Sequence, residues 1–554
     1  MQIKFIVFQA LAVSLVASVP LGVEEKAVSQ RSIELSVTTP VVLVTRQSKT
    51  DLENSPDPPP GIQDFFDRIR GKGKSGTARG TDGKDRLHSS LLPPSSYLVV
   101  RRQPRVIKMH YIRLLRPPVI NFKQTAAKQS QIHVELVLTI TTDLGDSFLC
   151  PKAPLDLDVF ISESSSRQNW DGISQNNEPD RAQQFRKVPT PRPPRWTAGS
   201  RVLKTEFLLP AFSSVEALSG ATLCVRPANR SLATDATADL LNTHGLVMPI
   251  YVELRPSEPA ETVALRRLRF SAPGVDQLVT MRRPVAVEVE EELGESIARH
   301  VWDAGVCTTA MLSSICCSTT PGGKMSTLPK LRGILATDDG LAVIEIGCGV
   351  GILGIGLATA LLHRQRCDSE QGAQTSIPRP VSILMTDLPE ARDRAVANIA
   401  RYSRMNSRGP SQREGEQDVP EEDRAVEALP ISVDYEDLDW EDGRKGTFGP
   451  KVNARPWDLV MLSDCTYNVD MLPALVETLT ALHRSVTVVS ASVAGPKVLL
   501  ATKPRHESEK ALFGLMRDAG WSISDQAVMP LPVMGGEAET IEVYLFTRPA
   551  DSGP

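Results

Sequence analysis

Hydrophobic and polar residues follow two different patterns along this chain of 554 residues. Between residues 109 and 285 the apolar runs are short and rich in β-branched residues, which is typical of strands. The clearest runs are residues 132–140, 202–209, 221–226 and 246–254. From about Val287 onward, helical spacing alternates with buried-type strands. That alternation favours a mostly parallel sheet covered by helices on both faces.

The second half of the chain predicts an ordered series of elements. Helical spacing with an acidic start covers residues 288–312. Strands are predicted at residues 341–346, 381–385, 431–433, 457–462, 498–502, 522–528 and 541–547. Helices are predicted between them at residues 350–362, 388–401, 471–482 and 508–519. Because the last two strands have only a short connection, we expect them to form an antiparallel hairpin at one edge of the sheet.

Other segments are polar and predict no packed core. Residues 1–18 resemble a secretory signal, with Lys4 ahead of an apolar run that is short for a transmembrane helix. Residues 49–96 and 163–196 have the composition of disordered segments, the second as a loop. We expect the functional polypeptide to start near Met109. The predicted divisions are an extension at 1–108, a β-rich accessory domain at 109–285 and an α/β domain at 286–547.

The most informative segment joins a buried strand to a helix through closely spaced glycines. Residues 347–351 read Gly-Cys-Gly-Val-Gly and follow the acidic residue Glu345. Glycine permits tight turns and close approach of a ligand. The dinucleotide fingerprint would need Gly or Ala at position 352, where Ile352 stands. The segment therefore indicates either another ligand site at the carboxyl end of a strand or a tight strand–helix junction.

Asp387 closes the next predicted strand, where a carboxylate can accept hydrogen bonds from both hydroxyls of a ribose. It lies 40 residues after Gly347, whereas about 20 is usual. The polar stretch 364–379 accounts for the difference. An ordinary helix N-cap before Pro389 is the alternative interpretation.

Four further segments follow a recognisable order. They are Val301-Trp302-Asp303-Ala304-Gly305, Leu438-Asp439-Trp440, the DxxY motif Asp464-Cys465-Thr466-Tyr467, and residues 503–509. Together with the glycine turn and Asp387, they resemble the class I, seven-β-strand methyltransferases, specifically the protein-lysine methyltransferases of the methyltransferase-like, fungal type. The resemblance covers residues 285–547. It implies a Rossmann-like methyltransferase sheet, S-adenosyl-L-methionine as cofactor and a protein lysine as methyl acceptor.

The resemblance also implies roles for individual residues. The implied cofactor-binding residues are Trp302, Glu345, Gly347, Cys348, Gly349, Gly351, Asp387, Trp440 and Ser463. Trp440 would lie against the adenine, Asp387 would take the ribose, and Glu345 would add negative potential near the cationic groups.

Asp464 and Tyr467 are the candidate catalytic residues. The carboxylate would hold the substrate amine, and the tyrosine would offer its hydroxyl or its ring face. A lysine with a pKa of about 10.4 must lose its proton before transfer, and no general base is assigned. Helix capping, or a place in the cofactor wall, is the alternative for Asp464.

Alternatives remain for the other residues and for the function. Trp457 is expected in the core, and His506 is expected at a helix start in preference to a role as a base. The insertion at 405–424 is interpreted as solvated, and residues 109–285 would help to recognise the substrate. A small-molecule N-methyltransferase, or a cofactor-binding protein-interaction module without methyl transfer, would be the alternative functions.

Composition limits the classes of binding partner and the cellular compartments that we expect. With 62 Lys+Arg and 66 Asp+Glu, the net charge of −4 argues against nucleic-acid binding through bulk charge. Eight cysteines are too few for a disulfide scaffold, and the adjacent Cys316 and Cys317 do not have metal-ligand spacing. Cysteines beside the candidate site suit a reducing compartment. We therefore expect a cytoplasmic or nuclear protein, or a secretory one if the signal-like segment is genuine.

Overall fold

The computed structural model describes two adjoining regions of the chain, which share one compact unit. The described residues are 109–124, 130–162, 185–190, 192–209, 218, 220–241, 246–255, 263–270, 285–292, 297–317, 328–337, 340–370, 380–406, 431–489, 495–531 and 539–549. The signal-like segment, the rest of the extension, most of the predicted loop at 163–196 and most of the 405–424 insertion lie outside them.

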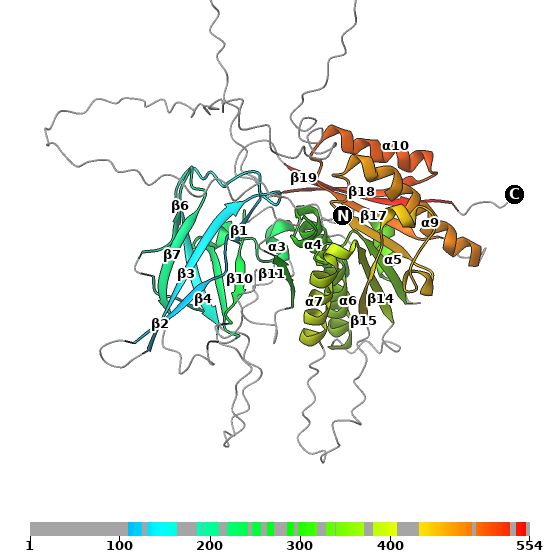
Figure 1. Ribbon diagram of the computed structural model, residues 1–554. Helices are drawn as coiled ribbons and strands as arrows, with labels where there is room; N and C mark the ends of the chain where they lie inside the picture. The colour runs from blue at the N-terminus through cyan, green and yellow to red at the C-terminus, as the bar shows by residue number, and fades with distance from the viewer. Residues whose placement is uncertain are drawn as a thin grey trace, which may run out of the picture. The chain divides into compact units, whose positions relative to one another are not determined.

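Two mostly antiparallel sheets form the β-rich domain (Figure 1). The first has the order β2-β3-β1-β9, with β7 also paired to β3; its strands are β1 (His110–Leu114), β2 (Val119–Gln124), β3 (Ser130–Thr141), β7 (Leu203–Leu209) and β9 (Val247–Met248). The second has the order β12-β11-β10-β8-β4-β5, with β6 paired to β4; its strands are β4 (Leu155–Ser162), β5 (Phe185–Lys187), β6 (Arg195–Trp196), β8 (Thr222–Pro227), β10 (Ile250–Glu253), β11 (Val263–Arg269) and β12 (Ala286–Glu292). Apolar residues from both sheets, such as Leu136 and Leu157, share one core.

The acidic segment predicted as the start of a helix is the strand β12, so that prediction was wrong. β12 pairs antiparallel with β11 along its whole length and buries Val287 and Val289. Its acidic residues face arginines: Glu288 pairs with Arg267, and Glu290 pairs with Arg394. These ion pairs neutralise acidic residues that were predicted to start a helix. The β-rich sheet therefore continues to Glu292, beyond the expected boundary at residue 285.

The end of the predicted loop 163–196 is also ordered. It carries the short strands β5 and β6, both paired with β4. Trp196 is fully buried, and its indole Nε1 donates to the carbonyl oxygen of Leu149 at 2.8 Å. One buried aromatic residue thus anchors a segment whose average composition is polar.

The α/β domain contains a seven-stranded sheet with the order β15-β14-β13-β16-β17-β19-β18. Its strands are β13 (Leu341–Ile346), β14 (Val381–Asp387), β15 (Ile431–Asp437), β16 (Leu459–Ser463), β17 (Lys497–Thr502), β18 (Ser522–Pro530) and β19 (Thr540–Thr547). All neighbours are parallel except β19, which runs antiparallel to β17 and to β18. The predicted Rossmann-like sheet and its edge hairpin are confirmed. Strand order reverses between β13 and β16, the position at which such sheets bind ligands.

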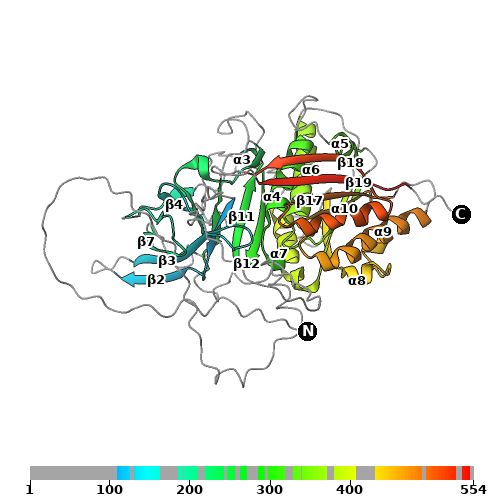
Figure 2. The same cartoon turned by 90° about the horizontal axis from the view of Figure 1, so that it is seen from above.

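Helices cover both faces of this sheet (Figure 2). One face carries α4 (Asp303–Cys317), α5 (Pro329–Leu335), α6 (Ile352–Glu370) and α7 (Pro389–Asn406), and the other carries α8 (Trp440–Gly443), α9 (Leu472–Val489) and α10 (Ala511–Asp518). A short 3₁₀ turn, η6 (Glu507–Lys510), precedes α10. Small residues of α6 allow close packing: a Cβ at Gly356 would lie 2.5 Å from Cγ2 of Thr309 in α4.

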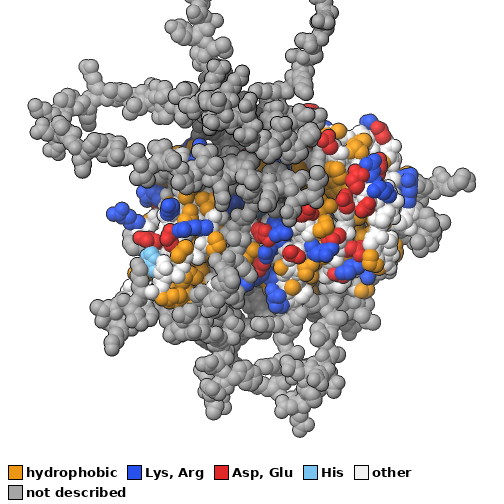
Figure 3. All heavy atoms as spheres, in the orientation of Figure 1, with side chains coloured by type: hydrophobic (Ala, Val, Ile, Leu, Met, Phe, Trp, Pro, Cys, Tyr) orange, Lys and Arg blue, Asp and Glu red, His pale blue; other side chains and the backbone are white. Residues whose placement is uncertain are grey.

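Acidic and basic side chains are interspersed on the visible face of the α/β domain (Figure 3). This agrees with the near-neutral charge of the sequence and offers no broad basic surface on that face. Among the described residues, no helix combines the length and the apolarity needed to cross a membrane.

Candidate functional site

The glycine turn between β13 and α6 is closely surrounded by other elements. Gly347, Gly349 and Gly351 have φ angles of 66°, 54° and 83°, a region that L-residues rarely adopt. A Cβ at Gly347 would lie 2.7 Å from Sγ of Cys465 and 3.6 Å from the ring of Trp440. The turn therefore needs glycine both for its backbone conformation and for the space around it.

Asp387, at the end of β14, fastens the glycine turn to the next strand. Its Oδ2 accepts a hydrogen bond from the Gly349 amide at 2.7 Å, and its Oδ1 accepts one from the Leu388 amide at 2.7 Å. Burial raises the pKa of this carboxyl above its usual value. Each carboxylate oxygen can accept more than one hydrogen bond, so both oxygens keep capacity for a ligand hydroxyl.

Glu345 lies under the turn, where it caps the first turn of α6. Its side chain is buried, and Oε2 accepts a hydrogen bond from the Gly354 amide at 3.0 Å. Burial raises the pKa of this carboxyl to about 8. A carboxyl that is largely protonated at pH 7 supplies little negative potential. The geometry thus gives Glu345 a structural role that differs from the electrostatic one expected from the sequence.

The raised pKa of Glu345 predicts a specific dependence of stability on pH. Because the folded-state pKa is about 8 and the usual value is 4.5, the native state loses stability as pH rises through that interval. Glu345→Gln keeps an acceptor for Gly354 but cannot ionise. We expect Glu345→Gln to match the wild-type melting temperature near pH 5 and to exceed it at pH 8.5 by at least about 2–4 °C, the shift that corresponds to 1 kcal/mol in a domain of this size. Melting curves at the two pH values measure this, and equal differences at both would contradict it.

The two tryptophans of the resemblance lie at the N-terminal ends of two helices. Trp440 is the first residue of α8, half-buried against Gly347, and follows the helix N-cap Asp439. Trp302 is half-buried just before α4, with the guanidinium of Arg505 5.4 Å from its ring centre. Each ring thus borders the ends of the central strands.

Ser463 and Cys348 lie at neighbouring strand ends. Ser463 ends β16, and its Oγ is 3.3 Å from the place that a Cβ at Gly305 would occupy. Cys348 is buried within the turn, and burial raises the pKa of its thiol. Close packing thus accounts for the small side chains at these two strand ends.

Asp464, the first residue of the DxxY motif, is held by backbone amides. Its φ of 53° is unusual for a residue other than glycine. Oδ2 accepts from the Ala304 amide at 2.8 Å, and Oδ1 accepts from the Lys503 amide at 3.2 Å. Burial raises the pKa of the Asp464 carboxyl. The side chain therefore fixes the start of α4 against the end of β17, close to the alternative interpretation of the sequence.

Tyr467, the last residue of that motif, is 54% exposed. Of the two candidate catalytic residues, Tyr467 is the solvent-exposed one. A substrate from solvent can reach it directly, whereas Asp464 is only 9% exposed.

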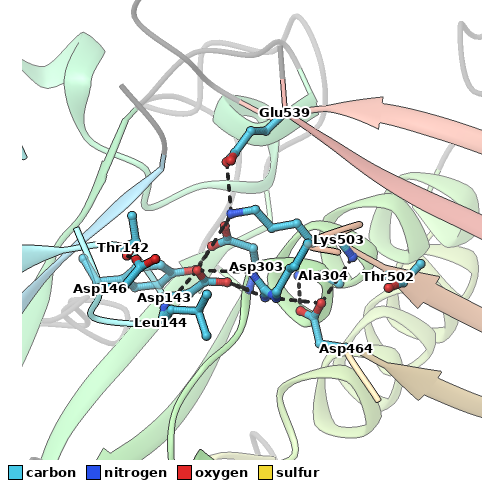
Figure 4. A network of polar contacts seen from close by, with 12 residues as sticks. Thr142, Asp143, Leu144, Asp146, Asp303, Ala304, Asp464, Thr502, Lys503 and Glu539 are labelled. Carbon is cyan, nitrogen blue, oxygen red and sulfur yellow. Dashed lines mark hydrogen bonds and ion pairs between the residues drawn. The ribbon is translucent and has the colours of Figure 1, made fainter. Parts of the chain in front are cut away.

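The structure joins two segments of the resemblance, 301–305 and 503–509, to residues of the β-rich domain through a group of polar contacts (Figure 4). Lys503 Nζ donates to Asp303 Oδ2 at 2.6 Å, and Arg505 Nη2 donates to Asp143 Oδ2 at 2.7 Å. Tyr111 donates its hydroxyl to Asp303 Oδ1 at 2.6 Å. The position of Lys503 and Arg505 directly after a buried strand was a signal for two of these residues. Tyr111 and Asp143 belong to the other domain, and no local sequence pattern marks them.

Two minor expectations are confirmed. Trp457 is buried in the core, with its indole Nε1 donating to the Val452 carbonyl at 2.9 Å. His506 is the N-cap of η6, where Nδ1 accepts from the Ser508 amide at 3.2 Å.

Comparison with known proteins gives one family match. Residues 282–409 and 414–519 match a family described as lysine methyltransferase. A UPF0665 family protein of Schizosaccharomyces pombe is 23% identical over 231 residues, which make up 42% of this chain and 49% of the relative. The chain thus spans about half the length of that curated relative.

Solved structures of methyltransferases align with part of this chain. An O-methyltransferase from Bacillus cereus in complex with SAH aligns over 45% of this chain and 92% of its own, with 13% identity and a TM-score of 0.22. A SAM-dependent methyltransferase from Methanosarcina mazei aligns over 40% and 98%, with 12% identity and a TM-score of 0.23.

The fold and the family match agree. The strand order of the sheet, the glycine turn at its reversal and the family match all fall within the same part of the chain. The α/β domain of this chain has the Rossmann-like sheet of class I methyltransferases, and over residues 282–409 and 414–519 it matches the lysine methyltransferase family.

Proposed function

We propose that this chain transfers a methyl group from S-adenosylmethionine to the ε-amino nitrogen of a lysine in a protein substrate. The observation that carries the proposal is the glycine turn at the reversal of strand order, with Trp440 on one side and Asp387 on the other. The match to the lysine methyltransferase family supports a lysine as acceptor.

The residues around the turn suit the separate parts of the cofactor. The two oxygens of Asp387 have acceptor capacity for the ribose hydroxyls, and the half-buried ring of Trp440 offers an apolar face for adenine. The backbone of residues 347–351 would pass beside the amino-acid part, and Trp302 and Ser463 would line the remaining walls. When bound, the cofactor supplies an electrophilic methyl group attached to its sulfonium.

The acceptor amine must arrive neutral and correctly oriented, because a lysine with a pKa of about 10.4 is protonated at pH 7. Asp464 is fixed by two backbone amides, so its remaining lone pairs point in defined directions and can hold the amine. Tyr467 is exposed and would meet the lysine at the entrance, through its hydroxyl or its ring. Orientation and removal of water are the main contributions that these residues would make.

The cofactor assignment predicts that Asp387→Ala weakens binding of S-adenosylhomocysteine. Loss of hydrogen bonds to a charged acceptor costs about 1.5–3 kcal/mol, which corresponds to roughly 10- to 150-fold in affinity. Isothermal titration calorimetry measures the change. Asp437→Ala is the matched control, because Asp437 ends the adjacent strand β15 and pairs with Arg392. Equal affinities for wild type and Asp387→Ala would remove Asp387 from the cofactor site.

A labelling experiment tests the reaction itself. The purified chain is incubated with tritiated S-adenosylmethionine and a cell lysate, beside the Asp464→Ala variant. Protein bands labelled by the wild type and lost in the variant would support the proposal. Label found only in small molecules would favour a small-molecule N-methyltransferase. Cofactor binding without any labelled acceptor would favour a protein-interaction module.

A further inference from the structure

A buried residue of the β-rich domain contacts the wall of the proposed methyl-transfer site. Asp143 lies in the turn after β3 and is only 3% exposed. The Leu144 amide donates to its Oδ1 at 2.9 Å, and Arg113 donates to its carbonyl oxygen at 2.9 Å. These contacts fix the position of the carboxylate within its own domain before any contact with the methyltransferase domain is considered.

The partners of Asp143 in the methyltransferase domain are the two cations that follow β17 and the backbone amide of Asp303, which donates to Oδ2 at 3.4 Å. Arg505 donates to Oδ2 of Asp143 at 2.7 Å. Lys503 Nζ lies 3.8 Å from Oδ1 of Asp143 (Figure 4). Lys503 also pairs with Asp303 at 2.6 Å and with Glu539 at 3.0 Å. Although burial alone would raise it, Arg505 and Lys503 hold the pKa of Asp143 below its usual value. Asp143 is therefore an ionised partner at neutral pH.

Arg505 lies between two carboxylates, and its distances to them are unequal. It is 2.7 Å from Asp143 but 3.4 Å from Asp464, and its guanidinium lies over the ring of Trp302. Without the negative charge of Asp143, the only carboxylate left within ion-pair distance of Arg505 among the described residues would be Asp464. A full ion pair there would neutralise the carboxylate proposed to hold the substrate amine, and it would draw the guanidinium away from Trp302.

We propose that Asp143 is a positioning residue for methyl transfer: it holds Arg505 over Trp302 and keeps this cation from pairing fully with Asp464. The β-rich domain then contributes an essential part of the site wall, in addition to any contact with the substrate. This inference rests on the proposed function, since Asp464 and Trp302 are placed in the site by that proposal.

The test compares Asp143→Asn with a matched control. The substitution keeps the size of the side chain and removes its charge. Asp235→Asn is the control, because Asp235 is equally buried and its arginine partners, Arg230 and Arg269, both lie in the β-rich domain. Melting temperature, cofactor affinity, and kcat and KM for the protein acceptor are measured for both. We expect Asp143→Asn to lower kcat/KM at least about tenfold beyond the control, as small displacements at a reacting site do.

A double-mutant cycle tests the same pair from the side of Arg505. Arg505→Gln removes the other member of the pair. The kcat/KM of the double variant Asp143→Asn/Arg505→Gln should be no lower than that of the less active single variant. Additive losses, or equal kcat/KM for Asp143→Asn and Asp235→Asn, would overturn the inference while leaving the proposed function intact. A wild-type chain that transfers no methyl group would remove both.

Discussion

Gly347→Ala is expected to reduce the affinity for S-adenosylhomocysteine about 5- to 150-fold, because the alanine is strained in two ways. A residue held at φ 66° costs about 1–3 kcal/mol when it is not glycine. The new Cβ would also lie 2.7 Å from Cys465 Sγ, so the turn must move away from β16 and from Trp440. Either displacement separates the backbone of the turn from the ring that would face the adenine. Isothermal titration calorimetry with the purified chain measures the loss.

Gly446→Ala is the control that separates the effect of backbone strain from the effect of a displaced glycine turn. Gly446 has a φ of 75°, but a Cβ added there would have nothing within 4 Å. This control should lower the melting temperature and leave cofactor affinity within about twofold of wild type. If Gly347→Ala bound the cofactor as well as Gly446→Ala does, the glycine turn would not be part of the binding site.

Arg266→Met is expected to destabilise the chain by about 3–5 kcal/mol, the usual effect of breaking a fully buried ion pair. Arg266 is 1% exposed and donates to Glu291 Oε1 at 2.8 Å. It also donates at 2.8 Å to the carbonyl oxygens of Pro249 and Ile112, so one side chain joins β11 and β12 to the first sheet. Its removal would leave the carboxylate of Glu291 buried without its cation. The shift of the urea unfolding midpoint measures the effect.

Two controls accompany Arg266→Met. Arg195→Met breaks the exposed pair with Asp156 and should leave the midpoint unchanged. Arg266→Met/Glu291→Leu removes both charges and should recover part of the stability, since an apolar pair avoids the uncompensated buried charge. A midpoint for Arg266→Met equal to that of Arg195→Met would contradict the importance of this contact between the two sheets.

The fold of the α/β domain could be predicted closely because its apolar strands are short, buried and separated by helical patterns. Strand β13 begins and ends where expected, and the edge hairpin of β18 and β19 follows from one short connection. The failure at β12 has a physical cause. Its closely spaced glutamates resemble the acidic first turn of a helix. In the strand, arginines from β11 and α7 neutralise Glu288 and Glu290, and those arginines are distant along the chain.

The candidate site could be predicted only where one stretch of sequence carries the information. The glycine turn, Asp387 and the DxxY motif are each local patterns at strand ends. Asp143 is 362 residues from Arg505, and Tyr111 is 192 residues from Asp303. Neither contact produces a local pattern in the sequence, because both depend on how the β-rich domain packs against the methyltransferase domain near the end of β17.

The most direct test of the central claim uses S-adenosylmethionine that carries a trideuterated methyl group. The purified chain is incubated with a lysate, and acceptor peptides are mapped by mass spectrometry beside a reaction with Asp464→Ala. We predict trideuteromethyl groups on lysine ε-nitrogens of one or a few proteins, present with the wild type and absent with the variant. Trideuteromethyl groups found solely on other atoms or on small molecules, or on the same lysines with both enzymes, would contradict the account.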